Sequence, residues 1–250
     1  MIDSKFGPTL GSDGVTFRLW APAARRVEVM LDMPHDMRRS DDGWFSVTVA
    51  AATAGTRYCF RVDGEMQVPD LASRFQPEGV FGPSEVIDHG RYRWRATAWR
   101  GRPWEETTVL EAHVGTFTPA GTYRAMIDKL DHLVTTGITA LELMPLADFP
   151  GERNWGYDGV LWYAPTSVYG SPDDLKTLID EAHLRGLMVF LDVVYNHFGP
   201  DGNYLGRYAP GFFSSAQTPW GNAINYREPH PRAFAIDNAL AWLRDYRFDG

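Results

Sequence analysis

Residues 187–197 run Leu187-Met188-Val189-Phe190-Leu191-Asp192-Val193-Val194-Tyr195-Asn196-His197. Five apolar side chains come first, and the run then carries a carboxylate, an amide and an imidazole. Near-continuous apolar runs are typical of parallel strands that helices cover, and barrel enzymes carry their chemistry where such strands end. The junction is therefore predicted to be a functional site. The alternative is that Asp192 and His197 only satisfy backbone groups at the end of the strand.

From Trp104 onward, strand and helix patterns alternate, which favours a parallel sheet. Strands are predicted at 109–114, 140–144 and 187–191, and helices at 123–135, 171–185 and 231–246. A long loop spans 196–230, and residues 248–250 lead toward a fourth strand. These units predict the first half of a (β/α)₈ TIM barrel, which as a whole takes about 250 residues. We therefore expect the sequence to stop short of a closed barrel.

Before Trp104 the apolar residues alternate with period two, as antiparallel strands require. The four clearest runs are 15–20, 26–31, 44–49 and 57–62. Their spacing predicts a small, immunoglobulin-like β-sandwich. We expect three parts: a β-sandwich domain at 1–90, a connector at 91–103, and the opening units of the catalytic barrel at 104–250.

The composition narrows the class of partner. The formal net charge is −8, which argues against nucleic acid because phosphate binding needs a basic face. Cys59 is the only cysteine, so no internal disulfide and no cysteine-based metal site is expected. No apolar window is long enough to span a membrane, and the first residues do not resemble a secretory signal. A cytoplasmic protein without metal or cofactor is expected.

A second group of candidate residues lies at 154–159, after the second strand of the barrel. The segment reads Asn154-Trp155-Gly156-Tyr157-Asp158-Gly159. Glycines permit a tight turn, and Trp155 and Tyr157 offer flat apolar faces beside a carboxylate. This combination suits a sugar, which has C–H groups on one face and hydroxyls at its edges. In the alternative interpretation the two aromatic rings pack inward.

Glu111 and Glu142 resemble a catalytic pair, because retaining glycosidases hold two carboxyl groups about 5 Å apart. Both, however, lie inside their predicted strands, whereas barrel enzymes use the carboxyl ends. We predict that they are barrel-interior acids with satisfied hydrogen bonds, and that His113 is a structural residue near the site.

The run Asp-Val-Val-Tyr-Asn-His resembles the first signature of the α-amylase superfamily of glycoside hydrolases and transferases. Five further segments carry the resemblance: 111–118, 148–151, 154–160, 196–204 and 218–221. Residues 15–90 also resemble the β-sandwich domain that precedes the barrel in glycogen-acting members, so the resemblance covers nearly the whole chain. Within that superfamily the match is closest to the trehalohydrolases that act on maltooligosyl trehalose. Glycogen branching enzymes are the nearest relatives, and they share the segments 143–145 and 163–167.

The resemblance implies a retaining hydrolase of trehalose biosynthesis. It would cleave the α-1,4 bond next to the terminal trehalose unit of maltooligosyl trehalose, by attack of one carboxylate while a carboxylic acid protonates the leaving oxygen. The alternatives are a 1,4-α-glucan branching enzyme and a non-catalytic α-glucan-binding fragment.

The resemblance also assigns roles to residues. Tyr157 would be the stacking floor of the cleavage subsite, Asp192 and His197 would hold hydroxyls there or orient the region of the nucleophile, and Asn196 would be mainly structural. Trp155 and Asp158 are further candidates for substrate binding. The nucleophile and the acid are expected after Gly250, so no catalytic residue is expected within these 250 positions.

Overall fold

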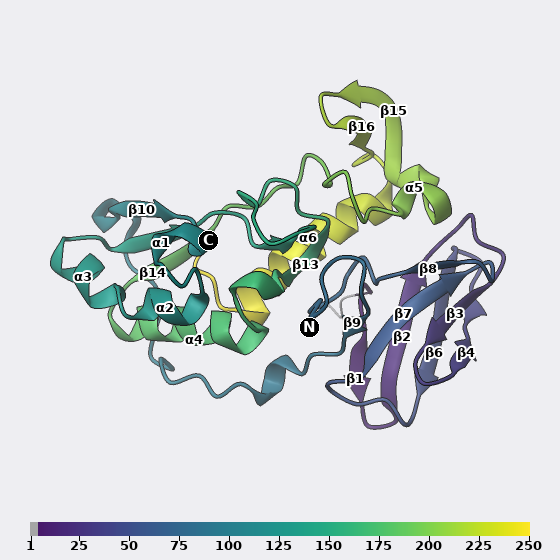
Figure 1. Ribbon diagram of the computed structural model, residues 1–250, viewed down its shortest axis with the longest axis horizontal. Coiled ribbons are helices and arrows are strands. Elements are labelled where there is room, and N and C mark those ends of the chain that lie inside the picture. Colours follow the sequence, from purple (N-terminus) through teal and green to yellow (C-terminus); the bar gives the residue numbers. More distant parts are fainter. Residues whose placement is uncertain (1–4) are drawn as a thin grey trace.

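The computed structural model describes residues 5–250 (Figure 1). In its first part, buried and exposed side chains alternate along the strands. In β2 (Gly14–Trp20), Val15, Phe17 and Leu19 are buried. β2 pairs antiparallel with β1 (Thr9–Gly11) and with β6 (Trp44–Val49), and β5 (Arg38–Arg39) pairs with β6. This order, β1-β2-β6-β5, forms the first sheet.

A second antiparallel sheet packs against the first. Its order is β4 (Pro34–Asp36), β3 (Val27–Met30), β7 (Arg57–Val62) and β8 (Met66–Val68), and β9 (Ser84–Glu85) pairs with β7. The sheets meet through side chains such as Phe17 and Tyr58, whose ring centroids are 4.8 Å apart. The predicted β-sandwich is therefore confirmed, with its strands at the predicted places.

The segment between the two parts lies along the barrel helix α4 (Pro172–Leu184). It contains two short 3₁₀ turns, η1 (His89–Arg91) and η2 (Trp104–Glu106). The buried carboxylate of Asp180, in α4, accepts hydrogen bonds from the backbone N–H groups of Arg95 and Ala96. These bonds tie an otherwise irregular segment to the helix.

Three parallel strands form the opening of the barrel, in the order β10 (Val109–Ala112), β11 (Ala140–Leu143) and β14 (Met188–Leu191). α4 begins with a capping box formed by Ser171 and Asp174 and has Pro172 in its first turn, as its sequence predicts. Beyond β14, Asp249 and Gly250 exchange backbone hydrogen bonds with Val189 and Leu191. The predicted half-barrel is confirmed.

The expected single helix at 123–135 is wrong in detail. The structure divides it into α2 (Tyr123–Ile127) and α3 (Leu130–Thr135), after a first short helix α1 (Val114–Phe117). Between them the backbone N–H of Lys129 bonds to the carbonyl of Met126, a tighter turn than an α-helix makes. Met126, Leu130 and Leu133 are all buried, so the tighter turn keeps one apolar face toward the sheet. The first strand also ends earlier than predicted, because Val114 belongs to α1.

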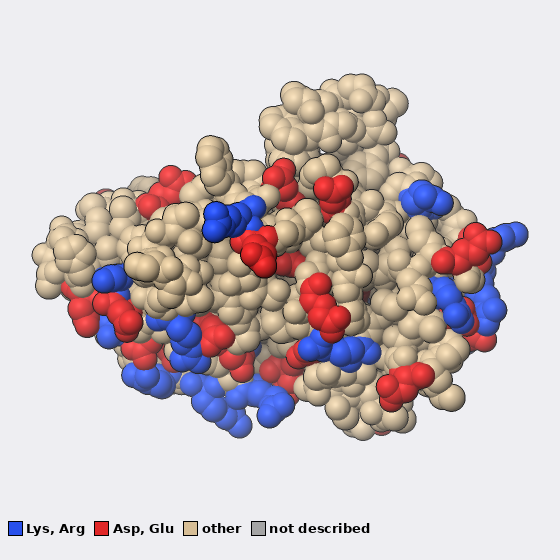
Figure 2. Space-filling model, in the orientation of Figure 1, with Lys and Arg blue, Asp and Glu red and all other residues tan. Residues whose placement is uncertain are grey.

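The segment predicted as a long loop at 196–230 contains regular elements of its own: α5 (Leu205–Tyr208), η4 (Pro210–Phe212), β15 (Phe213–Thr218) and β16 (Gly221–Ile224). The hairpin of β15 and β16 projects from the top of the view in Figure 1, and in Figure 2 this projection carries no charged side chain. The loop after β11 likewise contains β12 (Ala147–Asp148), β13 (Leu161–Pro165) and η3 (Ser167–Tyr169).

Helix α6 (Pro229–Asp245) runs between the barrel strands and the sandwich (Figure 1). At its first turn His230 stacks on Trp20 of β2 with centroids 4.2 Å apart, and Phe234 contacts Phe6 at 5.1 Å. The sandwich therefore uses aromatic side chains to hold the barrel. Among residues 5–250, no helix is both long and apolar enough to cross a bilayer.

Candidate functional site

Two loops meet where β11 and β14 end, and they bring three of the predicted site residues together. The hydroxyl of Tyr157 donates a hydrogen bond of 2.8 Å to Oδ2 of Asp192, although the two are 35 positions apart in the sequence. The backbone of Asp192 is held in turn by the carbonyl of Leu143, at the end of β11. Parallel strands end at one edge of a sheet, so residues from separate units converge there.

The Tyr157 ring remains accessible, with 38% of the residue exposed. The hydrogen bond to Asp192 raises the pKa of Tyr157 to about 12, with burial and the nearby Glu111 and Glu142 carboxylates acting in the same direction. At neutral pH the phenol is therefore protonated and donates to the carboxylate, while the flat ring stays available to a ligand.

His197 completes this group of residues, and only 7% of the residue is exposed. Its Nε2 atom lies 2.9 Å from the carbonyl oxygen of Tyr157, and its Nδ1 atom lies 3.0 Å from Oδ1 of Asn196. Trp220, at the tip of the β15–β16 hairpin, stacks on the imidazole with centroids 5.0 Å apart. Both ring nitrogens thus face protein atoms, so His197 fixes the Tyr157 loop. The aromatic residues of the long loop, Trp220 among them, are expected from the sequence to form a wall of the substrate cleft, and the contact of Trp220 with His197 shows only in three dimensions.

Asn154 organises the turn that carries Tyr157. Its Oδ1 accepts from the backbone N–H of Gly156 at 2.7 Å, and its Nδ2 donates to Asp158 at 2.7 Å. Its carbonyl oxygen lies 2.7 Å from Nε2 of His113. Asp158 and His113 therefore form hydrogen bonds with Asn154 in this turn, beside Tyr157, Asp192 and His197. An asparagine two residues before a glycine is a turn signal, and it could have indicated this role.

Gly156 must be glycine for a geometric reason. Its φ is +100°, and a Cβ atom there would lie 2.2 Å from the carbonyl oxygen of Pro145. The turn consequently presses against the end of β11. Trp155, on the outer side of this turn, is 77% exposed and lines a hollow that does not include Tyr157 or Asp192.

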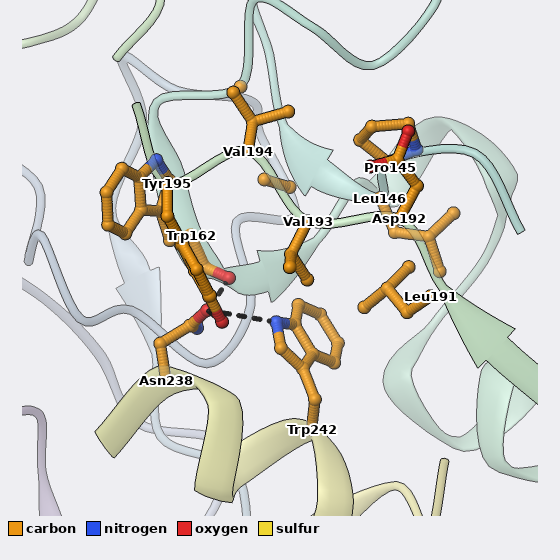
Figure 3. A pocket seen from close by; sticks show the side chains of 12 residues that line it. Pro145, Leu146, Trp162, Leu191, Asp192, Val193, Val194, Tyr195, Asn238 and Trp242 are labelled. Carbon is orange, nitrogen blue, oxygen red and sulfur yellow. Dashed lines mark hydrogen bonds between the residues drawn. The ribbon is translucent and has the colours of Figure 1, made fainter. Parts of the chain in front are cut away.

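Helix α6 supports the segment that follows β14, as Figure 3 shows. The buried Asn238 accepts hydrogen bonds at Oδ1 from the Tyr195 hydroxyl (2.7 Å) and from Nε1 of Trp242 (3.2 Å). Its Nδ2 donates to the carbonyl of Trp162 in β13 at 2.8 Å. One side chain therefore joins α6, β13 and the strand end that carries Asp192, and nothing in the helical pattern predicts it.

Glu111 and Glu142 lie opposite each other in the register of β10 and β11, one layer below Asp192. Within residues 5–250 neither carboxylate forms a hydrogen bond or an ion pair, so the expectation of satisfied acids is not met there. The same described part of the chain contains no group of three His, Cys, Asp or Glu side chains arranged to hold a metal ion.

Both the sequence and the fold of this chain resemble those of known proteins. Residues 5–75 match the model of carbohydrate-binding module 48, the isoamylase N-terminal domain. A malto-oligosyltrehalose trehalohydrolase from Deinococcus radiodurans is 48% identical over 97% of this chain. A 1,4-alpha-glucan branching enzyme from Photobacterium profundum is less similar, at 33% identity over 95% of this chain.

A crystal structure of a provisionally assigned alpha amylase from Salmonella typhimurium superimposes with a TM-score of 0.96 at 50% identity, over 99% of this chain and 43% of that one. The chain spans 40% of the Deinococcus protein and 37% of the branching enzyme. Residues 83–212, more than half of the sequence, match the model described as the alpha amylase catalytic domain. The chain therefore belongs to the alpha-amylase family.

Proposed function

We propose that the protein carrying this chain is a retaining hydrolase of maltooligosyl trehalose that releases trehalose. The observation that carries the proposal is the pairing of Tyr157 and Asp192 at the carboxyl ends of the strands, in a chain of the alpha-amylase family. The similarity to a named trehalohydrolase supports maltooligosyl trehalose as the substrate, and the lower identity to the branching enzyme makes transfer to a sugar hydroxyl the less favoured alternative.

In this proposal each residue has a defined task. The exposed ring of Tyr157 supports the C–H face of the glucosyl unit whose bond is cleaved. Asp192 has its Oδ2 on Tyr157 and keeps Oδ1 for a sugar hydroxyl. His197 and Asn196 position the Tyr157 loop. We propose that the nucleophile and the acid are contributed from beyond Gly250.

We also retain the proposed division into a sandwich domain at 1–90, a connector at 91–103 and a barrel from 104. A cytoplasmic location is proposed as well, because a chain with one cysteine, Cys59, has no internal disulfide that an oxidising compartment would favour.

Product analysis of the full-length protein tests the function. Incubation with maltotriosyl trehalose should release trehalose and maltotriose, and NMR at early times should show the α-anomer of maltotriose first, as retention requires. Appearance of the β-anomer first would contradict double displacement. Formation of α-1,6 branches from amylose, without release of trehalose, would favour the branching enzyme, and binding without turnover would favour the non-catalytic module.

A further inference from the structure

Trp155 is held out into solvent by a rigid turn. Among residues 5–250 it is the most exposed of the large apolar residues, at 77%. The Asn154–Gly156 hydrogen bond and the contact of Gly156 with Pro145 fix the backbone on either side of it. Exposure of a large aromatic side chain forgoes the free energy that burial would supply. A fixed and exposed indole offers a flat apolar face on which a ligand can stack.

The indole borders a hollow of about 520 Å³, within the range of ligand sites. The segment after β10 forms its other side, through His113, Gly115 and Thr116. A Cβ atom on Gly115 would lie 2.9 Å from the Tyr169 ring and 3.0 Å from that of His113. At Gly115 the hollow is therefore lined by the backbone, because no side chain fits there.

Two charged side chains in the hollow have no partner in the described structure. Glu152 and Arg153 both line it, and across residues 5–250 neither forms an ion pair or a side-chain hydrogen bond. A carboxylate accepts and a guanidinium donates hydrogen bonds in planar, paired geometry. Beside an aromatic face, this pair matches the hydroxyl edge and the C–H face of a sugar.

The same six-residue turn carries Tyr157 toward Asp192 and Trp155 into this hollow. We propose that the Trp155 hollow is an additional α-glucan subsite, which binds glucosyl units of the maltooligosyl chain beyond the unit on Tyr157. The inference rests on the proposed function for the identity of the chain. It adds a binding site whose contacts are separate from the Tyr157–Asp192–His197 group.

The openness of the hollow decides which end of the substrate it holds. The trehalose end must be distinguished from an ordinary glucan end, which requires enclosure so that wrong substrates leave polar groups unpaired. The maltooligosyl end varies in length and continues into solvent. An indole that is 77% exposed suits the second task.

The test compares substrates of different length in the full-length protein. For Trp155→Ala we expect kcat/KM for a maltooligosyl trehalose with five or more glucosyl units before the trehalose to fall about fivefold, mostly through KM, since one aromatic contact is worth roughly one kcal/mol. With a single glucosyl unit before the trehalose the change should stay below about twofold. Trp155→Phe should recover most of the loss, because it restores a flat ring.

Trp104→Ala is the matched control, because Trp104 is similarly exposed at 72% but precedes β10, at the opposite end of the strands. It should leave both substrates unchanged. An equal loss on short and long substrates, or no loss on long ones, would overturn the proposal. If the wild-type protein releases no trehalose, the proposed function fails, and calorimetry with maltoheptaose then tests the hollow alone: weaker binding by Trp155→Ala supports the subsite, and equal binding overturns it.

Discussion

Tyr157 combines two contributions that a pair of variants can separate. The hydroxyl fixes the side chain on Asp192, and the ring supplies the proposed stacking face. Tyr157→Phe removes only the hydrogen bond, so we expect kcat/KM for trehalose release to fall about tenfold. Tyr157→Ala removes both and should cost roughly a hundredfold or more. If Phe is as damaging as Ala, the hydroxyl rather than the ring carries the role, and the stacking assignment is wrong.

Asp148 gives the fold a dependence on pH. It is buried, its Oδ2 has no hydrogen-bond partner, and burial raises the pKa of its carboxyl from 3.8 to about 7. The folded state therefore binds a proton that the unfolded state releases above pH 4. The stability that this proton supplies is complete below the unfolded pKa and is lost as the pH rises toward 7, by about 1.4 kcal/mol per pH unit in that window.

Thermal melts of the wild type and of Asp148→Asn between pH 4 and pH 8 measure this effect. The wild-type melting temperature should fall relative to that of the variant up to pH 7 and stay at a constant difference above it. Asp70, whose buried carboxyl also has a raised pKa, about 6, is present in both proteins and cancels. A difference that does not change with pH would show that the Asp148 carboxyl titrates normally.

The two loops of the site depend on a close backbone contact at Gly199. Its N–H donates to the carbonyl of Gly159 at 3.0 Å, and a Cβ atom at Gly199 would lie 2.0 Å from the carbonyl oxygen of Asp158. Gly199→Ala should therefore displace one loop from the other. We expect the free energy of unfolding to fall by about 1–3 kcal/mol. The rate of trehalose release should fall by a larger fraction than the free energy of unfolding.

Gly206 supplies the matched control for this prediction, because it lies in α5 and a Cβ atom there meets nothing within 4 Å. Gly206→Ala should leave activity unchanged and stability equal or slightly higher. Urea denaturation and trehalose release, measured on both variants, make the comparison. Equal behaviour of the two variants would mean that the loops do not need this contact.

The three-stranded parallel sheet is open along β10, which has no neighbour on its outer side among residues 5–250. Val109 in that strand is 41% exposed. Exposed parallel edges favour pairing with other chains. A polypeptide of residues 1–250 produced alone should therefore self-associate, and light scattering coupled to size exclusion would measure its mass as a function of concentration.

A charge on the open edge tests the cause of this association. Val109→Lys should reduce it, because a charged side chain at an edge opposes pairing, whereas Leu10→Lys on the sandwich should not. A strictly monomeric polypeptide with a sharp two-state melt would contradict the prediction.

Local patterns in the sequence predicted the main strands of the sandwich and of the barrel, whereas the order of the strands within each sheet came from the structure. Period-two alternation predicted β2, β6 and β7, and apolar runs predicted β10, β11 and β14, since each depends on which face of one strand is buried. The pattern failed at 123–135 and at 196–230. At 123–135 the structure has a tightened turn at Lys129, and at 196–230 it has a hairpin with Trp220 at its tip. Both features depend on packing against other segments of the chain.

Asp192, Tyr157 and His197 could be named from the sequence as candidates, because polar and aromatic residues followed buried strands. Only the tertiary structure decided how they are joined. The bonds of Tyr157 to Asp192 and of His197 to Tyr157 link positions 35 and 40 apart, and Asn238 reaches Tyr195 and Trp162 from α6. Side-chain periodicity is a property of neighbouring residues, whereas these contacts depend on the packing of whole strands and helices, which brings distant loops to one edge of the sheet.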